Sequence, residues 1–246
     1  MNLYKKSIKT FNGDYMHIME GFLPSPWWQI WYVVSMVVVI YGIYKLNKLV
    51  SEKREILPLL AVAGAFIFVL SSLKMPSVTG SCSHPTGAGV SAIIFGPAIT
   101  SVLGIIVLIY QALFLAHGGI TTLGANVLSM GIIGPVVSYI IYKAGMKANL
   151  NFYLVVFLAA TIGDWATYVT TSIELALAFP AAVGGVMASF EKFAAIFAIT
   201  QVPLAIIEGA VSALLFKYVI NVKSDILVEL KVLEESTVRK LKGASA

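Results

Sequence analysis

Met16-His17-Ile18-Met19-Glu20-Gly21-Phe22-Leu23-Pro24-Ser25-Pro26-Trp27-Trp28 stands immediately before the first long apolar run of the chain. These thirteen residues contain a histidine, a carboxylate, a glycine, two prolines and two tryptophans. A neutral histidine is the commonest protein ligand of metals. We interpret the stretch as a metal-binding segment that folds into a membrane cage formed by the rest of the chain.

Composition places the chain in the membrane. Of its 246 residues, 59% are hydrophobic and 12% are charged, whereas soluble domains carry about 25% charged residues. The long apolar runs recur at nearly regular spacing, which predicts an all-α polytopic membrane protein in the lipid bilayer. The net charge of +5 does not indicate a nucleic-acid partner, because the Lys and Arg residues cluster between apolar runs as topology signals do. The single cysteine, Cys82, excludes an internal disulfide.

We predict seven transmembrane spans, with the amino end outside and the carboxyl end inside. The argument rests on basic loops, which tend to stay inside: one follows the first span and another holds Lys143 and Lys147. The predicted spans are residues 28–44, 56–73, a short third span of about 12 residues that ends near Phe95, and residues 98–116, 122–142, 152–171 and 193–218.

The short third span is the decisive choice. One helix over Val90–Ala116 is the alternative, but Gly96-Pro97 interrupts it, and proline removes a helix hydrogen bond. The single helix would also place Lys143 and Lys147 outside. A span this short requires the loop before it, Lys74–Gly89, to be buried in protein.

The chain divides into three parts. Residues 1–15 form a polar leader that we expect to be absent or removed in the working protein. Residues 16–220 form the transmembrane metal-binding domain. Residues 221–246 form a charged cytoplasmic tail in which Ile226, Leu230, Leu233 and Leu241 keep a helical spacing. It is interpreted as an amphipathic helix, with a solvated tail as the alternative.

The candidate site consists of the three histidines of the chain, His17, His84 and His117. In the seven-span topology all three lie at the outer face, which favours a metal site over three isolated polar residues. Cys82 is a possible soft ligand, but a thiolate would trap a metal that must be released, so we prefer a small buried residue there. Two acids, Asp164 and Glu208, lie inside predicted spans, where carboxylates are costly. They either serve function directly, hydrogen-bond between helices or touch a partner subunit.

The opening stretch resembles the amino terminus of the CbiM family, the cobalt-recognising membrane subunits of energy-coupling-factor (ECF) transporters. Three further segments look like signatures of that family: Ser81-Cys82-Ser83-His84-Pro85-Thr86-Gly87, Ala116-His117-Gly118-Gly119-Ile120-Thr121-Thr122-Leu123-Gly124-Ala125-Asn126 and Gln201-Val202-Pro203-Leu204-Ala205-Ile206-Ile207-Glu208-Gly209. The resemblance covers about residues 16–220 and departs from the family pattern in the leader, because that pattern starts at the methionine. The nickel-binding relative NikM shares the Met-His start and the later loop histidine.

The resemblance implies a substrate-capture (S) component, with a six-helix core and one extra amino-terminal span. It implies that the metal is held by the amine of Met16, the backbone nitrogen and side chain of His17, and His84, with His117 close to the site. An amine and the next backbone nitrogen close a five-membered chelate ring, and the His17 ring closes a six-membered one. Four nitrogens suit nickel and copper, and cobalt accepts them.

The implied function is that of the cobalt(II)-binding subunit of an ATP-driven importer in a prokaryotic cell membrane, supplying cobalamin synthesis. The chain has no Gly-x-x-x-x-Gly-Lys-Ser/Thr phosphate loop and no His-Glu-x-x-His, so we do not expect an enzyme. The implied partners are CbiO-like ATPase subunits, a CbiQ-like coupling subunit and a small CbiN-like subunit. A nickel(II) subunit of the same class is the alternative, followed by a metal channel that works without an ATPase.

Overall fold

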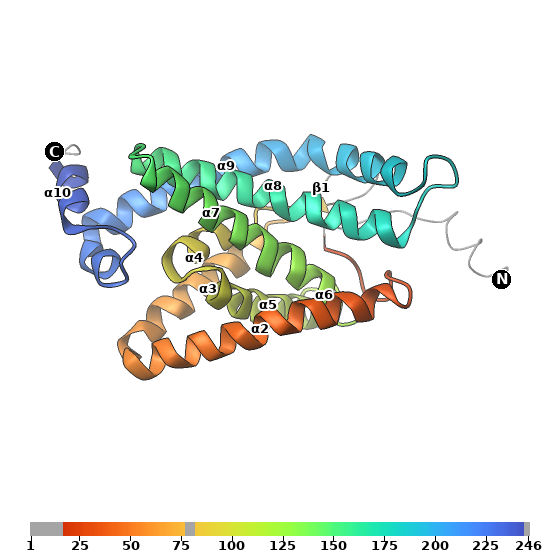
Figure 1. Ribbon diagram of the computed structural model, residues 1–246, viewed down its shortest axis with the longest axis horizontal. Coiled ribbons are helices and arrows are strands. Elements are labelled where there is room, and N and C mark those ends of the chain that lie inside the picture. The colour runs from red at the N-terminus through yellow and green to blue at the C-terminus, as the bar shows by residue number, and fades with distance from the viewer. Residues whose placement is uncertain (1–16, 77–81, 244–246) are drawn as a thin grey trace.

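The computed structural model describes residues 17–76 and 82–243, which form a helical bundle (Figure 1). Within these residues the only strands are a short antiparallel pair that joins Met75 to Ser83 and Pro76 to Cys82. The elements are α2 (Trp27–Glu52), the 3-10 turn η2 (Arg54–Ile56), α3 (Leu57–Ser72), β1 (Met75–Pro76), β2 (Cys82–Ser83), α4 (Ala88–Phe95), α5 (Pro97–Phe114), α6 (Leu123–Asn126), the π-helical turn η4 (Val127–Ile133), α7 (Gly134–Lys147), α8 (Phe152–Ala178), α9 (Gly185–Glu229) and α10 (Glu235–Gly243).

The prediction of an all-α polytopic membrane protein is confirmed. Six helical stretches among the described residues are long and apolar enough to cross a membrane. They are Trp27–Glu52, Arg54–Ser72, Pro97–Phe114, Leu123–Lys147, Phe152–Ala178 and Gly185–Glu229. Each corresponds to one of the predicted spans. The apolar runs placed five of the six starts within two residues, but four of the six helices extend 5 to 11 residues beyond the predicted ends.

The remaining predicted span is α4, which is too short to cross a membrane on its own. Its eight residues extend about 12 Å at 1.5 Å per residue, against a hydrocarbon core of about 30 Å. The break after it is real: Gly96 ends α4 with φ +80°, and Pro97 begins α5. The single-helix alternative for Val90–Ala116 is therefore wrong.

The segment that leads into α4 is buried in protein. Every residue from Ser83 to Ile93 is buried, which irregular backbone at membrane depth requires. Figure 1 shows α4 between a layer of α7, α8 and α9 and a second layer that contains α2, α3 and α5. On one side a Cβ at Gly89 would lie 3.1 Å from Cα of Ala160 in α8. On the other side Ser91 and Thr100 share a hydroxyl hydrogen bond of 3.0 Å between α4 and α5.

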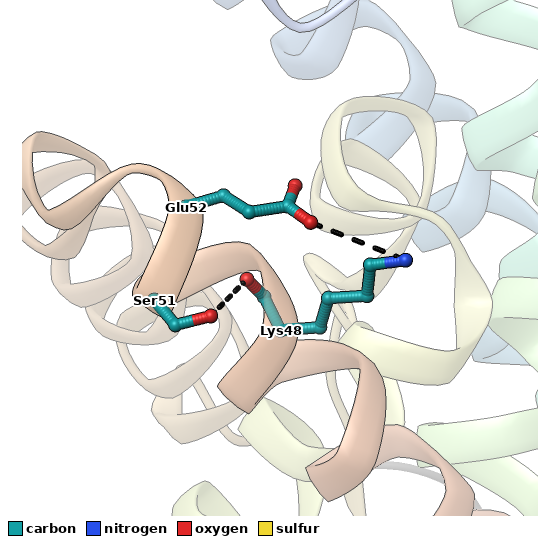
Figure 2. Close-up of polar contacts among 3 residues, drawn as sticks. All are labelled: Lys48, Ser51 and Glu52. Carbon is teal, nitrogen blue, oxygen red and sulfur yellow. Dashed lines mark hydrogen bonds and ion pairs between the residues drawn. The ribbon is translucent and has the colours of Figure 1, made fainter.

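The carboxyl end of α2 and the turn after it are rich in basic residues, namely Lys45, Lys48, Lys53 and Arg54. There the Ser51 hydroxyl donates to the Lys48 carbonyl at 2.8 Å, and the Lys48 ammonium lies 4.0 Å from the Glu52 carboxylate (Figure 2). This ion pair is exposed and contributes only about 0.3–0.5 kcal/mol. Lys53 and Glu229, 2.6 Å apart, connect the end of α2 to the end of α9.

The carboxyl-terminal residues pack against this same end. α9 continues to Glu229, and α10 follows after a short turn. The Tyr142 hydroxyl donates to the Val232 carbonyl at 2.5 Å, and Leu233 and Val238 join the buried cluster around Phe152 and Phe216. The tail is therefore not the single helix that the spacing predicted, because Leu230 and Leu233 lie in a turn between α9 and α10. Its apolar residues pack against the end of α7 and the start of α8.

The two ends of α2 define the direction of the bundle. His17 precedes the start of α2, and Lys53 follows its end. The 26 residues of α2 separate the two by about 39 Å. Since basic residues tend to stay inside, we continue to predict that the histidine end faces outward.

Candidate metal centre

Three histidine side chains from distant parts of the chain meet at one end of the bundle. The ring centroids lie 4.3 Å apart for His17 and His117, 4.6 Å for His17 and His84, and 5.1 Å for His84 and His117. One nitrogen from each ring can be chosen so that all three lie within 4.8 Å of one another. A group of three buried histidines this close together is a candidate metal-binding site.

Burial keeps these imidazoles neutral. All three side chains are buried, and desolvation lowers the pKa of His84 to about 4 and that of His117 to about 2. The pKa of His17 is also well below its ordinary value, because of burial and then because of the charges that His117 and His84 would carry. The neutral ring is the form that binds a metal, so the cluster is ready for a cation near neutral pH.

The hydrogen bond of His84 decides which of its nitrogens faces the cluster. Nδ1 lies 3.0 Å from the carbonyl oxygen of Pro85, and since a carbonyl only accepts, Nδ1 carries the proton. Nε2 then has a lone pair, and this buried atom has no hydrogen-bond partner among the described residues. An imidazole that donates one N–H to a carbonyl and offers the other nitrogen is the usual arrangement of a metal-binding histidine.

His17 is oriented in the same manner by Gln111, a residue of α5. Nε2 of His17 lies 3.2 Å from Oε1 of Gln111. The amide of Gln111 donates to the Ser71 hydroxyl at 2.7 Å, and Ser71 donates to the Ile67 carbonyl at 2.5 Å. Because this chain of donors leaves Oε1 as an acceptor, Nε2 of His17 carries the proton and Nδ1 is the nitrogen with the lone pair.

Gln111 was not among the residues that the sequence indicated. It is fully buried within a helix long and apolar enough to span the membrane. A polar amide within such a span is itself unusual, and this was the signal that could have found it.

The segment that carries His17 is held by the residues after α5. The backbone N–H of Ile18 donates to Oδ1 of Asn126 at 2.8 Å, and Nδ2 of Asn126 donates to the Ile18 carbonyl at 3.0 Å. The hydroxyl of Thr122 donates to the same carbonyl at 2.5 Å. Asn126 thus pairs with the backbone of Ile18 much as a neighbouring strand would.

Two glycines in the same segment allow this close approach. A Cβ at Gly119 would lie 2.4 Å from Cα of Glu20, and a Cβ at Gly124 would lie 2.5 Å from the backbone nitrogen of Tyr32. Both distances are impossible for real side chains. The stretch from Ala116 to Asn126 therefore packs closely against the segment around His17 and the first part of α2, and it contributes His117 as well.

The other candidate residues occupy different positions. Met16 and the leader, residues 1–15, lie outside the described residues. Cys82 lies in β2. Asp164 and Glu208 are buried, and their hydrogen bonds run to Gln201 and to the backbone that follows His84.

Comparisons with known proteins show relatives of this chain. A family model described as "CbiM: Cobalt uptake substrate-specific transmembrane region" matches residues 17–226. A candidate cobalt transport protein, CbiM 2, of Methanosarcina barkeri is 75% identical over 235 residues, which are 94% of this chain and 100% of that protein. A candidate cobalt transport protein CbiM of Methanocaldococcus jannaschii is 54% identical, covering 91% of this chain and 95% of that protein.

Solved structures share the fold. Two crystal structures described as those of a transition metal transporter, one of them truncated, superpose with a TM-score of 0.73 at 28% identity. The truncated one matches 83% of this chain and 98% of its own, and the other matches 84% and 93%.

Proposed function

Because this chain belongs to the CbiM family of cobalt uptake proteins, we propose that it is the cobalt(II)-binding subunit of an ATP-driven importer of the energy-coupling-factor class. The imported cobalt would supply cobalamin synthesis. The observation that carries the proposal is the buried group of His17, His84 and His117 at one end of a membrane bundle. A buried, neutral set of nitrogen donors is suited to binding a divalent transition metal, and this function fits the histidine cluster best.

We assign four nitrogen ligands to the metal. They are the amine of Met16, the backbone nitrogen of His17, Nδ1 of His17 and Nε2 of His84. The hydrogen bonds of the two rings support this choice, because Gln111 and the Pro85 carbonyl occupy the opposite nitrogens. His117 lies beside both rings, where it would influence the ligands without being one of the four.

The partners follow from the class of transporter. We propose that CbiO-like ATPase subunits supply the energy through a CbiQ-like coupling subunit, with a small CbiN-like membrane subunit as accessory. Contacts with the coupling and ATPase subunits would use the basic end, where the ends of α2 and α9 are joined by Lys53 and Glu229. The cell membrane of a prokaryote is the proposed location.

Nickel(II) is the second candidate substrate. Four nitrogens in a tetragonal set suit nickel at least as well as cobalt. The two similar solved structures are described only as transition metal transporters.

The test is uptake of radioactive cobalt(II) in a host that lacks its own importer. We expect uptake when this chain is produced together with its ATPase and coupling partners, and its loss when the ATPase carries an inactive phosphate loop. Uptake that persists without an active ATPase would contradict the importer and favour a channel. Competition by unlabelled nickel(II) against unlabelled cobalt(II) decides between the two substrates.

A further inference from the structure

The segment Gln201–Gly209 of α9 contains two buried polar side chains, Gln201 and Glu208. Their hydrogen bonds go to the backbone around His84. Polar side chains within membrane spans are costly and tend to be functional. The contacts of these two side chains indicate what they do.

Glu208 caps the short helix α4. Its carboxyl oxygens accept the backbone N–H of Thr86 at 2.5 Å and that of Gly87 at 2.9 Å, and Oε1 also accepts the Thr86 hydroxyl at 3.0 Å. Gly87 is the N-cap residue of α4, and its N–H is one of the groups that have no partner within the helix, whereas the N–H of Thr86 lies one residue before it. A carboxyl group is well suited to this place, since the helix N-terminus is positively polarised.

Gln201 fixes the backbone at His84 itself. Its Nε2 donates to the His84 carbonyl at 3.0 Å and to Oδ2 of Asp164 at 2.6 Å. Asp164, from α8, therefore accepts one N–H of the Gln201 amide and leaves the other directed at the loop. A third connection, between the hydroxyls of Ser83 and Thr200 at 2.6 Å, lies just before His84.

Close packing of α8 and α9 supports the position of these side chains. A Cβ at Gly209 would lie 2.2 Å from the Thr161 hydroxyl and 2.7 Å from the Phe157 carbonyl. Only glycine fits there, directly after Glu208. The approach of α9 to α8 is thus fixed at the residue next to the carboxyl group that caps α4.

We propose that Gln201 and Glu208 are positioning residues for the imidazole of His84. Together they fix the backbone at His84 and the two following N–H groups, and so determine where Nε2 of His84 lies in the metal site. The inference rests on the proposed function, because it takes His84 as a ligand of the transported metal. It assigns two of the buried acids as supports of the His84 loop. Glu208 acts directly, and Asp164 acts through Gln201.

The experiment uses the chain produced from Met16, the start that the proposed amine ligand requires, purified in detergent with cobalt(II) as the probe. Glu208→Gln keeps the size of the side chain but directs an NH2 group at N–H donors, and Gln201→Leu removes the donor to His84. We expect each to bind cobalt(II) about 10–100-fold more weakly, as for other residues that orient metal ligands. The matched control is Thr170→Val, which removes a 2.7 Å bond to the Ala166 carbonyl that stays within α8. We expect this variant to bind within about threefold of the parent.

A spectrum separates positioning from simple loss of stability. At saturating cobalt(II) the ligand-field bands of the two variants should shift, because Nε2 of His84 has moved. Variants that give the parent bands, or that bind within about threefold of the parent, would overturn the assignment. Gln201→Leu provides the decision if Glu208→Gln does not fold. A parent chain that binds neither cobalt(II) nor nickel(II) would instead overturn the proposed function, and this inference with it.

Discussion

His17 and Gln111 are joined by a hydrogen bond of 3.2 Å between Nε2 and Oε1, although 94 residues separate them in the sequence. The bond holds the segment before α2 against the carboxyl-terminal part of α5, where Gln111 lies. It also selects the His17 nitrogen that faces away from Gln111, which is the nitrogen that a chelate with the preceding backbone requires. The proposed metal site is thus oriented by a residue that we do not propose as a ligand.

The first prediction follows from this bond. Gln111→Leu removes the acceptor and should weaken cobalt(II) binding about 10–100-fold, the cost usual for a residue that orients a metal-binding histidine. Isothermal titration of the purified chain measures the change. Gln29→Leu is the control. It makes the same change of side chain, but the bond that it removes is a local one, from Gln29 to the Ser25 hydroxyl at 3.1 Å. Equal affinities in the two variants would contradict a role for Gln111.

The second prediction concerns His84 and His117. His84→Ala removes a proposed ligand and should abolish high-affinity metal binding while the chain still folds and inserts. His117→Ala should weaken binding only about 10–100-fold, as for a neighbour of the ligands. Equilibrium binding of cobalt(II) distinguishes them. Retention of affinity within about threefold by His84→Ala would rule out His84 as a ligand, and a complete loss in His117→Ala would make His117 a ligand.

The third prediction concerns the close contact between Gly119 and the segment that carries His17. Gly119→Ala puts a methyl group where the backbone of Glu20 lies, 2.4 Å from its Cα. We expect the segment around His17 to be displaced and metal binding to be lost, with little change in helix content by circular dichroism. Gly64→Ala is the matched control, since its Cβ would meet only Leu103 at an ordinary 3.8 Å. Normal binding by Gly119→Ala would show that the segment adapts.

The sequence predicted that the three histidines lie at one end of the bundle. That prediction depends only on how many times the chain reverses direction between them. Gly96-Pro97 ends α4 and begins α5, so the chain reverses there and returns His117 to the end where His84 lies. Hydropathy and one proline were sufficient for this step. They were not sufficient for the length of α4, because an apolar run of this size is equally consistent with a short span and with a buried core helix.

The residues that hold the histidines in place could not be predicted from hydropathy and proline positions. Gln111, Gln201 and Glu208 make hydrogen bonds to residues between 94 and 122 positions away in the sequence. Such contacts depend on how the helices rotate against one another, which periodicity alone does not determine. The sequence showed that Glu208 was unusual within a span, but only its distances to Thr86 and Gly87 show that it caps a helix.

The fourth prediction concerns orientation. In a Cys82→Ser background, a cysteine at Thr121 should react with an impermeant thiol reagent added to intact cells, and one at Ala148 should not. Both positions are exposed, and they lie at opposite ends of the helical stretch Leu123–Lys147. The expectation follows from the basic residues near Ala148, which tend to stay inside. The reverse labelling pattern would place the histidine cluster on the cytoplasmic side.

The last prediction concerns the amine of Met16. If Tyr15 is still attached, the nitrogen of Met16 is an amide whose lone pair is delocalised into the peptide bond, so one of the four proposed ligands is lost. We therefore expect the working protein to start at Met16. A chain produced from Met16 should bind cobalt(II) tightly, and the same chain with one glycine placed before Met16 should not, although every side chain is unchanged.

Mass spectrometry of the intact protein from its native host should show Met16 first. A metal-loaded protein that retains residues 1–15 and still transports would show that the amine is not a ligand, and the fourth donor would then have to be sought among the neighbours of His17, with His117 the first to test.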